Sequence, residues 1–352
     1  FLINPHGFLF GPNATLNVGG MVAFTAADYL RLEGVGGNGI FYADTTQTSV
    51  LTSVPVAAFG FMGLNPVAIA VQGSTLRVAP SQSISLVGGN SGFEYTDPDT
   101  GLTASTSVPG GVTMTGGKLI ALGGQINLAS VASPGAVSAV DFMPTAGMTM
   151  GSISLSQGAL LDVSADAAGM VRIRGGEFVI DNATISADTT DADGAQTAID
   201  INVTGDMSMS NDLAPALTAK TTGDGTAGAI NITSGNLEAI TSSSDNLLAL
   251  IDTHTSGTGT AGNVTIDAGD LHAINAAYFI DSGSAGPGHG GDVSISGTNV
   301  HMQESSIATG DARFGQRQGQ EVTGSAGNLT ITASDSLKIE TATITTEAFL
   351  AR

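Results

Sequence analysis

The sequence predicts an all-β protein whose chain winds into a right-handed parallel β-helix, a solenoid that also carries extra-helical hairpins and loops. One motif recurs as residues 261–266 (AGNVTI), 290–295 (GGDVSI) and 326–331 (AGNLTI), and more loosely as 227–232 (AGAINI). In each copy aliphatic residues alternate with a polar one, which is the pattern of a strand with one buried face. The copies recur about every 30 residues without helical periodicity, which is typical of a solenoid unit.

Each repeat unit is expected to contain three short strands. The first strands begin at equivalent apolar residues, namely Val171, Ile201, Ile230, Val264, Val293 and Leu329. The second strands carry apolar pairs, namely Phe178/Ile180, Met207/Met209, Leu237/Ala239, Leu271/Ala273, Val300/Met302 and Leu337/Ile339. The third strands centre on Ile185, Leu217, Ile251, Ile280, Ile307 and Ile344. Equivalent residues should stack from coil to coil, so we expect one column to hold Ile232, Ile266, Ile295 and Ile331. Parallel crossover connections are almost always right-handed, which sets the expected hand.

The composition agrees with this fold class. Of 352 residues, 49 are Gly and none is Cys or Trp, while only 12% are charged. Mean hydropathy is positive at +0.23, yet no apolar run reaches the roughly 18 residues that a membrane-spanning helix needs. The absence of Cys excludes disulfides, thiol chemistry and Cys-based metal sites.

The chain is strongly acidic. It carries 31 Asp and Glu against 10 Lys and Arg, a formal net charge of −21. Nucleic acid is therefore excluded as a partner, because phosphate binding needs clustered basic residues. The balance favours a solvated surface or one that collects cations.

The regularity of the chain suggests two domains, residues 1–115 and 116–352. Within the first, residues 34–39 (GVGGNG) read as a loop and 97–101 (DPDTG) as a turn, in segments expected to form hairpins or flaps against the coil. From Gly116 the coil strands resume, apart from an expected excursion at 129–149. A polar insertion at 314–320 lengthens a single loop, which a solenoid tolerates.

The first twenty residues carry the most specific pattern. Asn4, Pro5, His6 and Gly7 form a β-turn, because Pro presets the first central φ and Gly closes the turn. Residues 8–10 (FLF) and 15–18 (TLNV) are expected strands on either side of a second turn at 11–13 (GPN).

Residues 1–20 (FLINPHGFLFGPNATLNVGG) closely resemble the secretion domain of the filamentous haemagglutinin family, the exoproteins of two-partner secretion. His6 departs from the pattern, where the family usually has Asn. The resemblance implies a secreted, cell-surface or extracellular protein of a Gram-negative-type bacterium, recognised by a two-partner pore in the outer membrane. Asn4, Pro5 and Gly7 match the family's secretion motif. The later repeats are similar to shafts common in cyanobacterial members.

The chain begins at Phe1 without an initiator Met and ends without a polar capping segment. We therefore expect it to be part of a longer polypeptide, whose uncapped coils would permit end-to-end self-association.

No motif in the sequence specifies a metal site. The five histidines (His6, His254, His272, His289 and His301) lack ligand spacing, so exposed structural roles are expected, with His272 and His301 stacking on the outer face. The loop at 188–194 partly resembles a calcium loop, which makes Asp191, Asp193 and Asp200 weak candidate ligands against the alternative of a solvated turn. No cofactor other than calcium is suggested.

Catalysis is the less favoured function class. Some parallel β-helices degrade polysaccharides, but such sites need paired carboxylates on neighbouring coils. The carboxylates here are scattered through the loops: Asp162, Asp166, Asp181, Asp188, Asp200, Asp252 and Asp281. Arg172 and Arg174 share one side of a strand, where they either bind a carboxylate or cover the sheet with their stems. Asn263, Asp292 and Asn328 fit a corner ladder that Ala229 interrupts.

The favoured interpretation is a non-catalytic exoprotein. It would present a rod for adhesion or for biofilm and surface assembly, with a host, glycan or matrix receptor as its partner. The alternatives are a polysaccharide lyase or hydrolase and a calcium-stabilised extracellular spacer.

Overall fold

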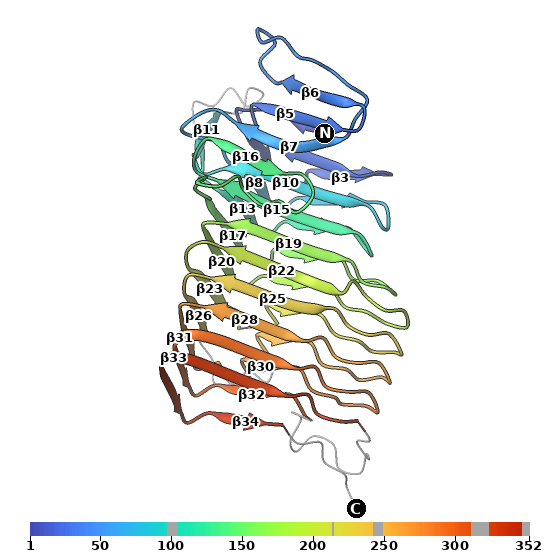
Figure 1. The fold of residues 1–352 in the computed structure, drawn as a ribbon, viewed down its shortest axis with the longest axis vertical. Helices are drawn as coiled ribbons and strands as arrows, with labels where there is room; N and C mark the ends of the chain where they lie inside the picture. The colour runs from blue at the N-terminus through green and yellow to red at the C-terminus, as the bar shows by residue number, and fades with distance from the viewer. Residues whose placement is uncertain (97–104, 213–214, 242–248, 277, 311–323, 347–352) are drawn as a thin grey trace, which may run out of the picture.

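The computed structural model describes residues 1–96, 105–212, 215–241, 249–276, 278–310 and 324–346. All regular secondary structure in these residues is β-strand. The strands stack into a single elongated coil whose successive turns follow one another along the long axis (Figure 1). This arrangement confirms the predicted parallel β-helix.

Three parallel rows of strands form the walls of the coil. The first row comprises β1 (Leu2–Ile3), β4 (Val22–Thr25), β10 (Ser83–Gly89), β15 (Gln125–Val131), β19 (Met170–Gly175), β22 (Thr197–Val203), β25 (Ala229–Ser234) and β28 (Val264–Ala268). The second comprises β2 (Phe8–Phe10), β8 (Ile69–Gln72), β13 (Val112–Thr115), β17 (Ser152–Ser156), β20 (Glu177–Asp181), β23 (Met207–Ser210), β26 (Leu237–Ile240) and β29 (Asp270–Ile274). The long strands β31 (Val293–Gln303) and β33 (Leu329–Glu340) belong to both rows and join them into one 18-stranded sheet.

The third row is a separate 10-stranded sheet, so the described residues form ten coils. Its members are β3 (Thr15–Val18), β9 (Thr75–Val78), β14 (Lys118–Ile120), β18 (Leu160–Asp162), β21 (Thr184–Ser186), β24 (Leu217–Thr218), β27 (Ile251–Asp252), β30 (Ile280–Asp281), β32 (Ser306–Ala308) and β34 (Thr343–Thr345). The six predicted third-strand residues pair in register from Ile185 to Ile344.

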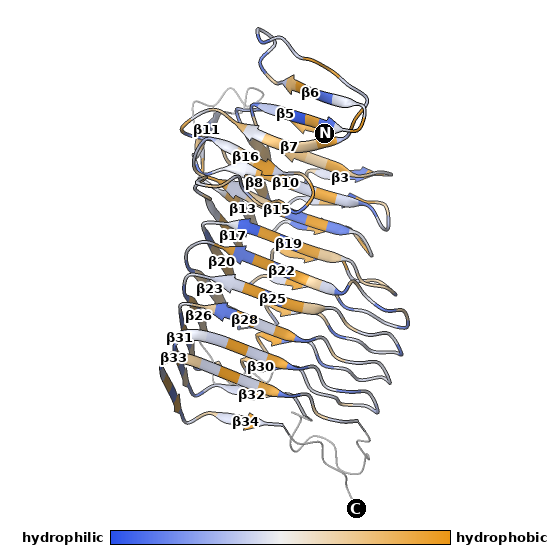
Figure 2. Cartoon of the chain, in the orientation of Figure 1, coloured by the Kyte–Doolittle hydropathy of each residue, from blue (hydrophilic) through white to orange (hydrophobic). Residues whose placement is uncertain are grey.

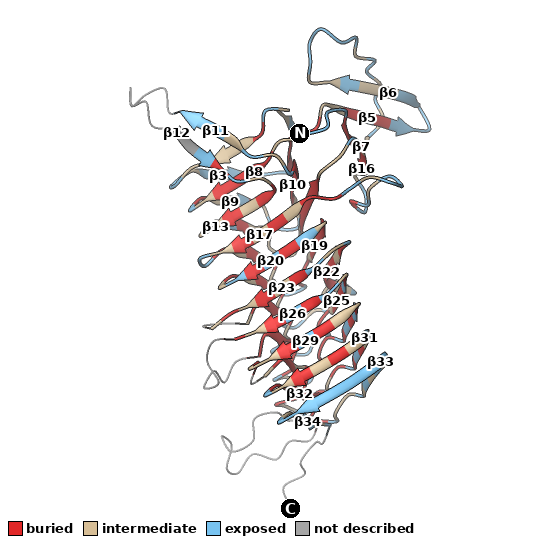
Figure 3. Cartoon of the chain, turned by 90° about the vertical axis from the view of Figure 1, so that its left-hand side faces the viewer, coloured by how far each residue is buried: buried red, intermediate tan, exposed pale blue. Residues whose placement is uncertain are grey.

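The core fills the inside of the coil with stacked aliphatic side chains. The predicted column is confirmed, because Ile232, Ile266, Ile295 and Ile331 are successive register partners. Figure 2 shows apolar stretches on the coil strands, and Figure 3 shows that these stretches are buried in the middle coils, whereas the strands of the first and last coils hold only intermediate and exposed residues. Sheets stabilise such columns because each strand places every second side chain on the same face.

One predicted register is wrong by two residues. Val171 pairs with Ile199, and Ile173 pairs with Ile201, so the first strand of that unit starts earlier than the sequence suggested. Apolar and polar residues alternate from Ile199 to Val203 in β22, and a shift of two keeps the same face inward. The pattern alone therefore could not choose between Ile199 and Ile201.

Two excursions leave the first coils. A four-stranded antiparallel sheet, in the order β16-β7-β5-β6, contains β5 (Tyr29–Gly34), β6 (Gly37–Tyr42), β7 (Val56–Phe61) and β16 (Gly135–Ser138). The hairpin of β11 (Phe93–Thr96) and β12 (Ser105–Val108) forms the other. Both lie near the N-terminal end of the stack (Figures 1 and 3). These elements confirm the predicted hairpins, including the excursion near 129–149.

The glycine-rich segment at 34–39 is a hairpin and not the predicted loop. Gly34 and Gly37 are register partners that close a two-residue turn at Val35 and Gly36. Gly37 has a φ of +121°, a conformation that glycine adopts without the cost a side chain would bring. The turn at 97–101 and the insertion at 314–320 lie outside the described residues.

The coil continues through the expected domain boundary. β13 ends at Thr115 and pairs with β8 before it and β17 after it, while β14 likewise pairs with β9 and β18. The division into residues 1–115 and 116–352 therefore remains a prediction about function within one continuous stack. In the described part of the chain, no helix has the length and apolarity to cross a membrane.

Candidate functional site: an N-terminal turn and the outer faces of the coil

The predicted turn at the start of the chain is formed and closed by several hydrogen bonds. The Gly7 amide donates to the Asn4 carbonyl at 2.9 Å, and the Asn4 side-chain amide donates to the Gly7 carbonyl at 2.8 Å. The Asn4 backbone amide donates to the Thr25 carbonyl of the next coil at 2.9 Å. Asn4 thus fixes the turn internally and also ties it to β4.

Gly7 lies where a side chain does not fit. Its φ is +87°, and an added Cβ would lie 2.5 Å from the Ala68 carbonyl oxygen and 2.9 Å from a ring carbon of Phe93. The turn is therefore packed against the second coil and the β11–β12 hairpin. Pro5 is half-buried and His6 is exposed, so the His at position 6 faces solvent.

The weak calcium candidates do not come together. The carboxylate of Asp193 accepts a hydrogen bond from the Thr226 amide at 2.8 Å, which lowers its pKa below the usual value. Asp200 lies in β22, where its carboxylate contacts Arg174 at 2.5 Å. Among the described residues, Asp191, Asp193 and Asp200 do not form a group with ligand atoms within 4.8 Å of one another.

Arg172 and Arg174 both bind Asp200 across one coil spacing. Arg172 lies 3.6 Å from the carboxylate, and only 13% of its side chain is exposed, against 7% for Arg174. Burial, followed by the neighbouring Arg174, lowers the pKa of Arg172. Arg172 also donates to the Val140 carbonyl in the excursion at 3.1 Å. The sequence left two roles open for these arginines, binding a carboxylate or covering the sheet. In the structure they bind a carboxylate and also cover the sheet.

The histidines divide into two environments. His272 and His301 stack as predicted, with ring centroids 5.9 Å apart, and His301 contacts Glu340 at 3.2 Å. His254 contradicts the expectation of exposure, because it is buried beside Asp252. This burial was not predictable from the pattern, because burial of an outward residue depends on which segments cover the row.

Polar ladders run along the corners of the coil. The Asp292 amide donates to the Asn263 side chain at 2.8 Å, and the Asn328 amide donates to the Asp292 carboxylate at 2.7 Å, which confirms the predicted ladder. A second ladder, not predicted, links Asp206, Asn236, Asp270, Asn299 and Ser336. The sequence pattern that could have predicted this ladder is a polar residue just before the apolar pair of each second strand.

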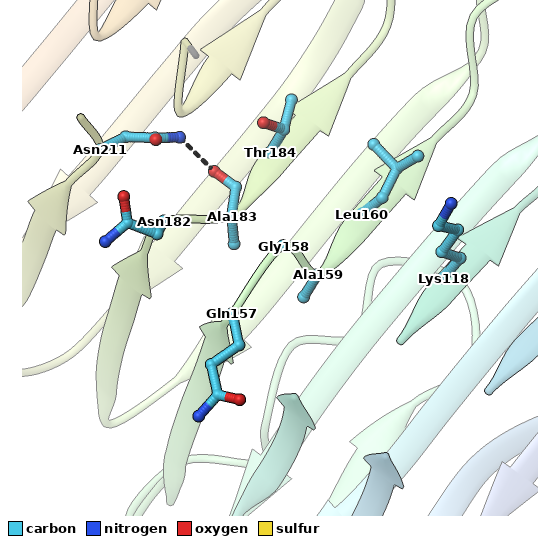
Figure 4. A pocket seen from close by; sticks show the side chains of 9 residues that line it. All are labelled: Lys118, Gln157, Gly158, Ala159, Leu160, Asn182, Ala183, Thr184 and Asn211. Atoms are coloured by element: carbon cyan, nitrogen blue, oxygen red, sulfur yellow. Dashed lines mark hydrogen bonds between the residues drawn. The ribbon is translucent and has the colours of Figure 1, made fainter. Parts of the chain in front are cut away.

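An open groove of about 460 Å³ lies on the corner between the second and third rows (Figure 4). The amides of Gln157, Asn182 and Asn211 contribute to one side, and Lys118 lies at the opposite end from Asn211. The Asn211 side chain donates to the Ala183 carbonyl at 2.8 Å. Among the described residues that line the groove, there is neither a carboxylate nor a histidine. Such a lining can bind polar ligands but offers no general acid and base pair.

Comparison with known families identifies the N-terminal half of the chain. A family model described as the TPS secretion domain matches residues 1–178, slightly more than half of the chain. No curated protein and no solved structure matches. The matched segment holds the N-terminal turn, the excursions and the coils as far as β20. Proteins of this family are secreted across the outer membrane of Gram-negative bacteria with an outer-membrane transporter as partner. The chain belongs to this family, the two-partner secretion exoproteins of the filamentous haemagglutinin type.

Proposed function

We propose that the chain forms a non-catalytic rod that, once exported, serves in adhesion or surface assembly. The observation that carries this proposal is the continuous stack of ten coils that starts inside the secretion domain and runs on beyond it. Strand spacing of about 4.8 Å gives such a stack a length of roughly 45 Å. A rod of this kind holds its outer faces at a distance from the end that the transporter engages.

Asn4, Pro5 and Gly7 are proposed as the secretion motif that the transporter needs. The turn is rigid, since it has hydrogen bonds within itself and to Thr25, and it has no room for a side chain at Gly7. Transport would depend on the shape of this turn, because the first coil that leaves the pore can template the next one.

The secretion test compares variants of the two N-terminal turns in cells that express the partner pore. Asn4→Ala and Gly7→Ala should reduce the protein in the medium at least tenfold. The matched control is Pro12→Ala in the second turn, which should be secreted normally. Equal secretion of all variants would contradict the motif. Thermal melting of each refolded protein distinguishes a lost signal from a lost fold.

Adhesion is supported by the amide-rich groove of Figure 4, where polar side chains surround the apolar Ala159 and Leu160. Amides beside small apolar groups suit sugar hydroxyls, and Lys118 suits an acidic group on the ligand. The absence of carboxylates among the lining residues favours binding over hydrolysis.

Binding of the purified chain to an array of glycans, matrix proteins and cells tests this part. We expect saturable binding that Asn182→Ala combined with Asn211→Ala weakens, while Asn263→Ala on another corner leaves it unchanged. No binding across the array would argue against an adhesive role. Release of unsaturated sugars from an acidic polysaccharide would instead indicate a lyase.

A further inference from the structure

A partly buried group of potential metal ligands lies on the third row, in two neighbouring coils. Asp252 ends β27 and Asp281 ends β30, and the two residues are register partners. Their predecessors Ile251 and Ile280 are fully buried in the coil core. Because side chains alternate along a strand, both carboxylates lie on the outer side, one coil spacing apart.

His254 completes the group. It follows Asp252 by two residues, and its Nδ1 lies 2.6 Å from an Asp252 carboxylate oxygen. One ligand atom from each of Asp252, His254 and Asp281 lies within 4.8 Å of the other two. The side chains of Asp252 and His254 are only 10% and 11% exposed. Three potential ligands thus converge, and two of them are largely shielded from water.

The local charges favour a cation. Two stacked carboxylates repel each other, and partial burial strengthens the repulsion because water screens it less. Lys220 is a basic neighbour of the group, with Nζ 4.0 Å from Asp252, but it also contacts Asp188 at 3.7 Å. Within the described residues, the lysine beside Asp252 is therefore shared with a carboxylate outside the group.

The arrangement is confined to these two coils. The position before β27 in the third row holds Thr218, and the position after β30 holds Ala308, so neither adds a carboxylate. Parallel bridges align Thr221, Thr255 and Ser284 in successive coils. The residues just before them therefore occupy equivalent positions, and these are Lys220, His254 and Gly283. The pairing of Asp and His is therefore a local departure from the repeat and not a consequence of it.

We propose that Asp252, His254 and Asp281 bind a divalent transition metal ion, with Zn²⁺ as the reference ion, and that the ion clamps two coils of the shaft. An imidazole with two carboxylates is a ligand set of zinc sites, whereas calcium sites use oxygen ligands. Three protein ligands leave a fourth position for water. The site is distinct from the loop that contains Asp191 and Asp193.

The test is a Zn²⁺ titration of the chelator-treated full chain, monitored by calorimetry and by thermal melting. The stacked pair His272 and His301 on the outer face can also attract zinc, so the reference protein carries His272→Gln and His301→Gln. We expect this reference to bind one equivalent of Zn²⁺ and to melt at a higher temperature with the ion. The near-isosteric changes Asp252→Asn, Asp281→Asn and His254→Gln should each lower the affinity at least tenfold and remove the thermal shift.

Lys220→Met provides a test in the opposite direction. The positive charge of Lys220 competes with the ion for the carboxylates, so removal of this charge should tighten Zn²⁺ binding by about tenfold. The proposal is overturned if the reference and the His254→Gln protein bind Zn²⁺ equally, or if Lys220→Met weakens binding. Saturation by Ca²⁺ in preference to Zn²⁺ would overturn the assignment of the ion. Melting without metal shows whether each variant is folded.

Discussion

The first four coils and the later coils differ in the residues on the outer face of the first row. In the early coils, Ala23, Val87 and Ala129 are buried beneath the antiparallel excursion, where they join a second hydrophobic cluster. In the later coils, the register partners that continue the column of Val87 and Ala129 are polar, namely Asn202, Thr233, Asp267, Ser296 and Thr332. Inside the coil, by contrast, one continuous cluster serves both regions.

This difference shows that the same repeat can carry either a covered or a solvent-exposed outer face. A parallel coil needs only its inward column to stack, so its outward residues are free to vary. The secretion domain uses them to attach a covering sheet, while the shaft leaves them solvated. Arg174 continues the column of Val87 and Ala129 at the boundary, and Arg172 beside it contacts the Val140 carbonyl of the excursion.

The largest expected effect comes from a matched pair of buried phenylalanines. Phe59 belongs to the covering sheet and Phe178 to the coil core, and both are about 1% exposed or less. Each change to Ala should cost about 3–5 kcal/mol, from lost transfer energy and the cavity left behind. Amide hydrogen exchange should show the loosening of β5 and β7 alone for Phe59→Ala.

For Phe178→Ala, exchange should instead increase in the coils on both sides of β20, because each coil is stabilised by its neighbours. Indistinguishable exchange patterns for the two variants would show that the covering sheet and the coil unfold as one unit. The two hydrophobic clusters could then not be regarded as separate units of stability.

Much of this fold could be predicted because the determining signal is local. The inward residues from Phe178 to Ile344 recur with small changes in spacing, and period-two alternation sets their face. The exact register at Ile199 and the covering of Val87 were not predictable, because both depend on contacts between distant segments. His254 and Asp281 are 27 residues apart by number, and only the stacking of β27 on β30 makes them neighbours.

The second effect tests the boundary between the two regions. Asp200→Asn removes the charge that compensates Arg172 and Arg174, both of which are mostly buried. Breaking a buried pair costs about 3–5 kcal/mol, and the partial exposure of Asp200 reduces this to about 2 kcal/mol. Urea denaturation should show the loss.

The matched control is Asp267→Asn, since Asp267 accepts a hydrogen bond from Ser296 on the open face and belongs to no ion pair among those the structure describes. It should change the free energy of unfolding by less than about 0.5 kcal/mol. Equal losses for the two variants would mean that the arginine pair has no special role at the boundary.

The smallest effect concerns two exposed aspartates, one that is bonded to the next coil and one that is bonded within a single loop. Thr190 donates to Asp166 of the preceding coil at 2.8 Å, and Thr46 donates to Asp44 within one loop at 2.8 Å. Hydrogen bonds lower the pKa of both carboxyls; the largest contribution is the Thr190 hydroxyl for Asp166 and the Thr46 amide for Asp44. A lowered folded-state pKa gives stability above the unfolded value of about 3.9, which is lost as pH falls through the folded pKa.

Thr190→Val should therefore lower the melting temperature of the shaft slightly at about pH 6, and this difference should vanish well below the unfolded Asp pKa of about 3.9. Thr46→Val should have a smaller effect at either pH, because its hydrogen bond joins residues of the same loop and holds no coils together. Scanning calorimetry of both variants at the two pH values measures these changes in melting temperature. A larger effect from Thr46→Val would show that contacts between coils add nothing at the exposed loops, and that the inward columns alone hold the shaft together.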